Sequence, residues 1–313
     1  MSSEERKRYV YGPVPSRRLG RSLGVDLVPF KTCTFDCVYC QLGRTTNKTY
    51  ELREWHPLEE VLEDVEAALS SNPDYITLSG SGEPTLFSRT GELIARIREM
   101  THTPIALITN SSLLSNPEVR RAACGVDLAV PSLDAGSAES FRRVNRPADC
   151  VSFDEMVEGL VEFARRFEGR IWLEVMLVEG FTATEEEVER IARIARRLGP
   201  DRIQLNTPTR PPAEDEARPV PPERLEQFAR MLGEKAEVIA DFKLAEHGGE
   251  FQARREDVLS LLERRPCTLD DVAAGLDVHP NEALKHIDAL LADGLVVAVG
   301  RGGRTYYEAG RGE

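Results

Sequence analysis

Three of the six cysteines fall within eight residues, at Cys33, Cys37 and Cys40. Thiolates this close together on a short loop can bind one metal centre. A structural zinc ion requires four ligands, but no fourth cysteine lies nearby and the nearest histidine, His56, comes sixteen residues after Cys40. A cubane iron–sulfur cluster normally takes four thiolates, so three would leave one iron open to a substrate or cofactor. The alternatives are a zinc loop and a set of buried cysteines without a metal.

A second motif lies downstream, where residues 78–85 read Leu-Ser-Gly-Ser-Gly-Glu-Pro-Thr. The cysteine loop, with Tyr39 just before its last cysteine, resembles the signature loop of the radical S-adenosylmethionine (SAM) superfamily. The second motif is similar to the Gly-Gly-Glu-Pro motif of the same superfamily, with Ser81 replacing the first glycine. Both motifs occur in this order and each follows an expected strand, so the resemblance favours an iron–sulfur cluster over the alternatives.

The resemblance implies that Cys33, Cys37 and Cys40 hold a [4Fe-4S] cluster whose open iron binds the amino and carboxylate groups of SAM. One electron from a reductant such as a flavodoxin or ferredoxin would then break a carbon–sulfur bond of SAM. The resulting 5′-deoxyadenosyl radical would take a hydrogen atom from a substrate. Such chemistry requires a protein that fixes the sulfonium near the cluster and excludes water and oxygen.

The resemblance also implies which residues contact SAM. The turn formed by Gly82, Glu83 and Pro84 would meet the methionyl amine with backbone carbonyls and the Glu83 side chain, and Tyr39 would lie near the adenine. The other expected contacts lie near strand ends: Asn110, Ser132 and Asp134 toward the ribose and carboxylate, Met176 and Val178 beside the adenine, and Asn206. Side chains such as Ser132 and Asn206 can also simply cap the ends of their strands.

The elements that must position these residues follow from hydrophobic periodicity and turn signals. Strands are expected at residues 23–28, 75–79, 105–109, 126–132, 170–178 and 202–206. Helices are expected at residues 57–69, 90–99, 117–123, 153–167, 184–198 and 222–235. Residues 11–22, rich in glycine, proline and arginine, are expected to form a loop.

Six strands, each followed by a helix, predict an α/β fold with parallel pairing and right-handed crossovers. Six units are too few to close an eight-stranded barrel, so we expect an open, partial (β/α)6 barrel. The radical SAM resemblance implies the same fold. Active sites of α/β barrels gather at the carboxyl ends of the strands. The cysteine loop, the turn at Glu83, Asn110, Asp134 and Asn206 are all expected at that rim.

The C-terminal part is expected to form a separate unit. Residues 247–250 read as a linker, which predicts a radical SAM domain over residues 1–247 and a second domain over residues 251–313. Helices are expected at residues 254–265 and 269–274 and from Pro280 onward, followed by a hairpin from residues 295–299 and 305–307. Three helices and a hairpin resemble a winged helix, a module that often docks on DNA. Its third helix carries Asn281, Lys285 and His286 and its wing carries Arg301 and Arg304, so contact with nucleic acid and docking of a protein or substrate both remain open.

Residues 11–25, 33–43 and 204–211 resemble, within the superfamily, a group related to 4-demethylwyosine synthase, which modifies tRNA. The similarity covers about residues 9–245, and Arg210 is a candidate for facing the substrate. That enzyme takes a second cluster from cysteines upstream of the signature loop, whereas this chain has no cysteine before Cys33. A tRNA base is therefore one expected substrate, but the tricyclic-base chemistry is not implied.

Composition limits the remaining possibilities. The net charge of −13 disfavours unassisted, nonspecific binding to nucleic acid. No apolar run is long enough to span a membrane and no signal segment follows the N-terminus, so we expect a cytoplasmic protein.

The function alternatives are an activating enzyme that places a glycyl radical on a partner protein and a non-enzymatic iron–sulfur transcriptional sensor.

Overall fold

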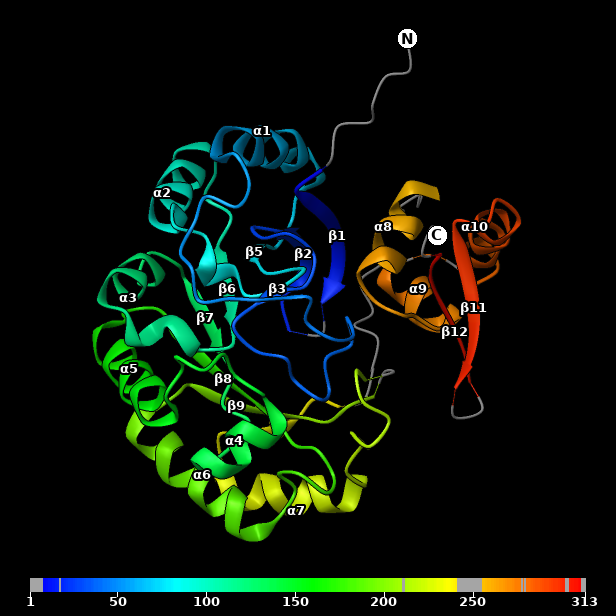
Figure 1. Cartoon of the computed structure of the whole chain (residues 1–313). Coiled ribbons are helices and arrows are strands. Elements are labelled where there is room, and N and C mark those ends of the chain that lie inside the picture. Colours follow the sequence, from blue (N-terminus) through cyan, green and yellow to red (C-terminus); the bar gives the residue numbers. More distant parts are fainter. Residues whose placement is uncertain are drawn as a thin grey trace.

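Figure 1 shows the computed structural model of the chain, which describes residues 8–16, 18–209, 212–240, 255–276, 278, 280–301 and 304–310. Within these residues an eight-stranded sheet has the order β1-β2-β5-β6-β7-β8-β9-β10. Its strands are β1 (Val10–Ser16), β2 (Gly20–Val25), β5 (Tyr75–Leu78), β6 (Ile105–Thr109), β7 (Leu128–Pro131), β8 (Arg170–Met176), β9 (Arg202–Asn206) and β10 (Ala236–Val238). Neighbouring strands from β2 to β10 are parallel, and β1 is antiparallel to β2. The predicted α/β fold with a mostly parallel, open sheet is confirmed.

Helices cover the outer side of the curved sheet (Figure 1). They are α1 (Leu58–Ala68), α2 (Thr90–Met100), α3 (Pro117–Ala123), α5 (Phe153–Arg166), α6 (Glu185–Leu198) and α7 (Pro222–Leu232). Helix α4 (Ala138–Val144) instead packs against the cysteine loop, where the Phe141 ring meets that of Phe35. Local chemistry explains their starts: the Thr184 hydroxyl accepts the N–H of Glu187 as the N-cap of α6. Their apolar faces pack on the sheet to form the core. Among the described helices, none combines the length and the apolar content that crossing a bilayer requires.

The sequence prediction was wrong at the first edge of the sheet. Most of residues 11–22 form strands: β1 pairs with β2, and the register shifts between Tyr11 and Val14. Pro13 and Pro15 pointed to a loop because a proline cannot donate a ladder hydrogen bond. An edge strand with an irregular register tolerates prolines, and β1 is such a strand. The expected strand at residues 23–28 accordingly begins at Gly20 and ends at Val25.

Short elements hold the loops at the carboxyl ends of the strands. β3 (Thr32–Cys33) and β4 (Asn47–Lys48) pair in parallel at the two ends of the cysteine loop. The 3-10 helices η1 (Leu69–Ser71), η2 (Pro84–Leu86) and η3 (Ser112–Ser115) shape the connections that follow α1, β5 and β6. The sequence did not indicate these elements, nor α4 and β10, because each is too short for a clear periodicity.

The C-terminal residues form three helices and a hairpin around a separate hydrophobic cluster. The elements are α8 (Arg255–Arg264), α9 (Leu269–Gly275), α10 (Pro280–Ala292), β11 (Val296–Arg301) and β12 (Arg304–Ala309). β11 and β12 are antiparallel, and Cys267 exchanges two backbone hydrogen bonds with Tyr307 of β12. Helices α8 and α9 lie beside β1, at the open edge of the sheet (Figure 1). The expected linker at residues 247–250 lies outside the described residues.

Candidate functional site

The cysteine loop lines a cavity at the carboxyl ends of the strands. Cys33, Cys37 and Cys40 all border this cavity, whose volume is about 470 Å³. Each sulfur accepts a hydrogen bond from a side-chain nitrogen, and the donors are Asn110 Nδ2 to Cys33 at 3.5 Å, Asn145 Nδ2 to Cys37 at 3.4 Å and Lys31 Nζ to Cys40 at 3.3 Å. N–H donors around thiolates are what an iron–sulfur site provides to its sulfurs. Burial raises the pKa of the Cys33 thiol to about 12 and raises that of Cys37 well above its usual value.

The donor set fits a cluster held at three corners. Among the described residues that line the cavity there is no histidine and no further cysteine. No three cysteine, histidine or carboxylate side chains in the described part of the chain are arranged to hold a single metal ion. Three cysteines without a fourth protein ligand fit a cubane cluster with one open corner better than a structural zinc ion, which requires four ligands.

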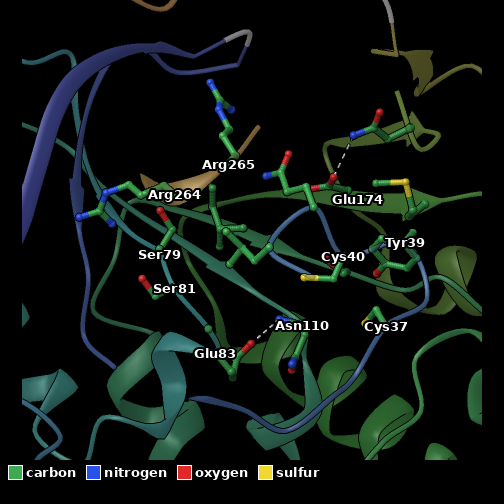
Figure 2. A pocket seen from close by; sticks show the side chains of 18 of the residues that line it. Cys37, Tyr39, Cys40, Ser79, Ser81, Glu83, Asn110, Glu174, Arg264 and Arg265 are labelled. Atoms are coloured by element: carbon green, nitrogen blue, oxygen red, sulfur yellow. Dashed lines mark hydrogen bonds between the residues drawn. The ribbon is translucent and has the colours of Figure 1, made fainter. Parts of the chain in front are cut away.

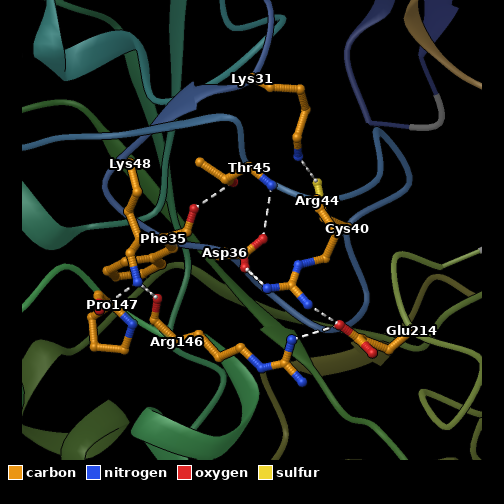
Figure 3. A network of polar contacts seen from close by, with 10 residues as sticks. All are labelled: Lys31, Phe35, Asp36, Cys40, Arg44, Thr45, Lys48, Arg146, Pro147 and Glu214. Atoms are coloured by element: carbon orange, nitrogen blue, oxygen red, sulfur yellow. Dashed lines mark hydrogen bonds and ion pairs between the residues drawn. The ribbon is translucent and has the colours of Figure 1, made fainter.

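Polar contacts fasten the cysteine loop to its surroundings (Figure 3). The Arg44 guanidinium pairs with Asp36 at 2.6 Å and with Glu214 at 2.5 Å, and Arg146 pairs with the same Glu214 oxygen at 2.6 Å. Within the loop, the Thr45 N–H donates to Asp36 Oδ1 at 2.8 Å. Arg44 is largely exposed, so each pair stabilises the loop only weakly, but together the pairs tie the loop to the connection between β9 and α7.

The turn at Gly82 and Glu83 packs directly against the cysteine loop. The Glu83 N–H donates to the Thr32 carbonyl at 3.1 Å, and a Cβ on Gly82 would lie 1.7 Å from the same oxygen. The Glu83 side chain is buried, and its carboxylate accepts hydrogen bonds from Thr85 N (3.1 Å), Thr85 Oγ1 (2.5 Å), Thr109 Oγ1 (2.6 Å) and Asn110 N (2.7 Å). Burial raises the pKa of Glu83, and these hydrogen bonds oppose that rise.

The buried carboxylate of Asp134 holds neighbouring residues in place through hydrogen bonds. The Tyr39 hydroxyl donates to this buried carboxylate, Asn145 Nδ2 donates to it at 2.7 Å, and the Met176 N–H donates to it at 3.0 Å. Burial raises the pKa of Asp134 to about 6. Asp134 therefore positions Tyr39 and the end of β8, and its expected contact with SAM stays a prediction.

The structure brings most of the expected SAM-contacting residues to one cavity. Those that line it are Tyr39, Gly82, Glu83, Asn110, Ser132, Met176 and Asn206. Figure 2 labels Tyr39, Glu83 and Asn110 among them. Pro84, Asp134 and Val178 are buried and lie outside the lining. Arg210, expected to face the substrate, lies outside the described residues.

Sequence reasoning missed several residues of the site. Glu174 lies inside the barrel, where its carboxylate accepts from Arg18 at 2.6 Å and from Asn206 Nδ2 at 3.3 Å. Glu174 stands among apolar residues of β8, two residues before Met176. This position was a signal that could have placed Glu174 on the inner face of the sheet together with Met176. Asn145 carried no such signal, because its contacts with Cys37 and Asp134 depend on how α4 packs.

Comparisons with known proteins agree with this geometry. The family described as "Radical SAM superfamily" matches residues 27–195. A UPF0026 protein of Methanocaldococcus jannaschii is 33% identical over 308 residues, which cover 95% of this chain and 94% of that protein. A protein named GTPase Obg from Brachyspira hyodysenteriae is 36% identical over 299 residues, but these are 94% of this chain and only 44% of that longer protein. The crystal structure of a radical SAM methyltransferase from Sphaerobacter thermophilus shares the fold with a TM-score of 0.51 at 19% identity, over 70% of this chain and 66% of that one.

Proposed function

Because this chain belongs to the radical SAM superfamily and, within it, to the UPF0026 family, we propose that it abstracts a hydrogen atom from a substrate bound in the cavity beside Cys40. The chain is an enzyme whose cofactors are a [4Fe-4S] cluster and SAM. A cluster held by Cys33, Cys37 and Cys40 would supply, when reduced, the electron for cleavage of a carbon–sulfur bond of SAM, and this cleavage would provide the hydrogen-abstracting group for the substrate. A flavodoxin or ferredoxin is the proposed electron donor.

The observation that carries the proposal is the contact between the two motifs. Cys33, Cys37 and Cys40 would hold the cluster, and the Thr32 carbonyl beside Cys33 accepts the N–H of Glu83. The Glu83 carboxylate and the backbone of Gly82 and Pro84 would therefore meet the SAM amine close to the open corner of the cluster. A fixed separation of these two groups is what orients the sulfonium for cleavage.

The remaining residues have positioning and contact roles in the same proposal. Tyr39, held by Asp134, would lie against the adenine, with Met176 beside it. The other proposed contacts with SAM are Asn110, Ser132 and Asn206 through polar side chains and Val178 through its backbone. The fixed tyrosine and backbone groups reduce the reorganisation that binding requires.

Replacing Glu83 with glutamine tests its proposed role. The amide would remove the charge that faces the SAM amine, so the Kd for SAM is expected to rise at least about tenfold. The amide nitrogen of glutamine would also replace one carboxylate oxygen and would face a backbone N–H or a hydroxyl donor without accepting its hydrogen bond. This loss is expected to lower the free energy of unfolding by about 1–3 kcal/mol. Equilibrium dialysis with SAM and thermal unfolding measure the two effects.

The matched control is Glu92→Gln, because Glu92 is an exposed glutamate on α2 that pairs with Arg89 at the surface. This control should leave both the Kd for SAM and the unfolding temperature nearly unchanged. An unchanged Kd in the Glu83 variant would remove Glu83 from the SAM site.

We propose a tRNA base as the first substrate to examine. The similarity of residues 11–25, 33–43 and 204–211 to the group of 4-demethylwyosine synthase supports it. In the same proposal, residues 1–247 form the radical SAM domain and residues 251–313 a winged helix that docks RNA or a partner protein. The pairing of Cys267 with Tyr307 supports the winged helix, because it adds a third strand position to the hairpin. A cytoplasmic location is part of the same proposal, because thiols such as those of Cys33, Cys37 and Cys40 remain reduced there.

Two measurements test the proposed function. Reconstituted, dithionite-reduced protein should convert SAM to 5′-deoxyadenosine and methionine. Modified nucleosides of tRNA should differ between a deletion strain and its parent. A difference in a protein glycyl radical instead would favour the activating-enzyme alternative, and absence of 5′-deoxyadenosine under all conditions would favour the transcriptional sensor.

A further inference from the structure

The cavity is lined by an excess of basic side chains although the chain is acidic. The net charge is −13, yet the described charged residues that line the cavity are four basic and two acidic ones: Arg18, Lys31, Arg264, Arg265, Glu83 and Glu174. Cavity walls of low dielectric constant strengthen the field of such charges. Basic side chains concentrated at one site of an acidic protein indicate an anionic ligand, unless groups of the protein itself compensate them.

Three of the four basic groups are compensated in this way. The pairs are Arg18 with Glu174 at 2.6 Å, Lys31 Nζ with the Cys40 sulfur at 3.3 Å, and Arg264 with Asp26 at 3.0 Å. Each of these cations therefore has a carboxylate or a cysteine sulfur of the protein beside it, and none of the three is left over for a substrate.

Arg265 is the exception among these four. In the described part of the chain it forms no hydrogen bond and no ion pair, and its Nε is shielded from solvent without an acceptor. A buried N–H group without an acceptor is unfavourable, and a ligand oxygen that accepts a hydrogen bond from it would remove that cost. Figure 2 places Arg264 and Arg265 on the side of the cavity opposite Glu83 and Asn110.

The contacts of Arg264, the residue before Arg265, explain how the C-terminal unit holds Arg265 at the cavity. The Arg264 guanidinium lies over the Tyr11 ring, 3.6 Å from its centroid, and pairs with the buried Asp26. Asp26 also accepts the Ser81 N–H at 3.0 Å and the Ser81 hydroxyl. The end of α8 is thus anchored to the turn that carries Glu83. Ser81, which departs from the family motif, supplies part of that anchor.

We propose that Arg265 binds an oxyanion of the substrate, a phosphate or a carboxylate, at the side of the cavity opposite the SAM-binding turn. This assignment rests on the proposed function and names the chemical class of its substrate. A guanidinium presents two parallel N–H donors that match two oxygens of either group. It also makes the C-terminal unit part of the substrate site, because Arg265 follows α8 and lines the cavity together with Leu261 and Arg264.

Equilibrium dialysis of the full-length, reconstituted protein tests the proposal. The binding of radiolabelled pyrophosphate and of radiolabelled succinate is measured separately. Saturating SAM is present in each case, so that a bound probe occupies a site that SAM does not. Wild-type protein should bind one of the two probes saturably at about one per chain. Arg265→Gln should weaken that binding at least about tenfold, and Arg265→Lys, which keeps the charge without the fork, should weaken it less.

The matched control is Arg165→Gln, an exposed arginine on α5 that does not line the cavity, and this variant should bind the probe as the wild type does. Binding of pyrophosphate alone identifies a phosphate site, and binding of succinate alone identifies a carboxylate site. The proposal is overturned if neither probe binds saturably or if Arg265→Gln binds as well as wild type. SAM cleavage is measured on the same preparations without probe, so failure of the proposed function is seen independently of the anion site.

Discussion

Alanine at Cys33, Cys37 or Cys40 is expected to abolish reductive cleavage of SAM, with each single substitution lowering the rate to below detection. Each change removes one of three ligands, and two thiolates cannot hold a cubane with a defined open corner. Loss of a group that merely supports a metal ligand typically costs about 10–100-fold in affinity or activity, so loss of a ligand should cost more. Iron and sulfide analysis, with chromatography of 5′-deoxyadenosine, provides the measurement.

Two other cysteines provide the control for this experiment. Cys124 is half-buried away from the site and Cys150 is exposed. Alanine at either position should leave the iron content and the rate of SAM cleavage within about twofold of wild type, because surface substitutions rarely change stability by more than about 0.5 kcal/mol. A loop variant that retained about four irons per chain and normal cleavage would contradict the assignment of the three ligands.

Alanine at Gly82 is the second substitution with a large expected effect. The new Cβ would lie 1.7 Å from the Thr32 carbonyl oxygen and 2.7 Å from its carbon, both of them backbone atoms of β3. Neither β3 nor the Glu83 turn can move without breaking the hydrogen bond that joins them. We expect a loss of unfolding free energy of about 1–3 kcal/mol, as for other overpacked sites. Even a variant that stays folded should lose most SAM binding, because the turn would move away from the cysteine loop.

Gly91→Ala is the matched control for that substitution. Gly91 lies in α2, where a new Cβ would meet only Ala122 at ordinary contact distances of 3.5 Å or more. Alanine in a helix should leave SAM binding unchanged and raise stability by up to about 1 kcal/mol. If Gly82→Ala matched this control in both thermal unfolding and SAM dialysis, the close packing of the two motifs would be refuted.

Much of the fold was predictable because local signals agreed with one another. Six hydrophobic strands alternating with helices identified β2 and β5 to β9, and parallel pairing placed their carboxyl ends at one rim. Residues far apart in sequence could therefore be assigned to a common site. Asn110 and Met176, for example, both line the cavity beside the cysteine loop.

The remaining features depend on packing that no local pattern contains. Pro13 and Pro15 favoured the prediction of a loop. Prolines are tolerated in β1 because it is an edge strand, and the sequence alone does not show which strand lies at the edge. The hydrogen bonds of Asp134 with Tyr39 and Met176 could not be foreseen, because these partners come from distant segments of the chain. The contact of Arg264 with Asp26 spans most of the chain and could be seen only after the C-terminal unit had been placed.

Electron paramagnetic resonance of the anaerobically reconstituted and reduced protein, recorded before and after addition of SAM, tests the central claim most directly. In the proposed site, three cysteine ligands would leave one iron of the cluster free to coordinate SAM. The account therefore predicts the signal of a reduced [4Fe-4S] cluster whose shape changes when SAM is added. A preparation that binds about one zinc per chain, or a cluster signal that SAM leaves unaltered, would contradict it.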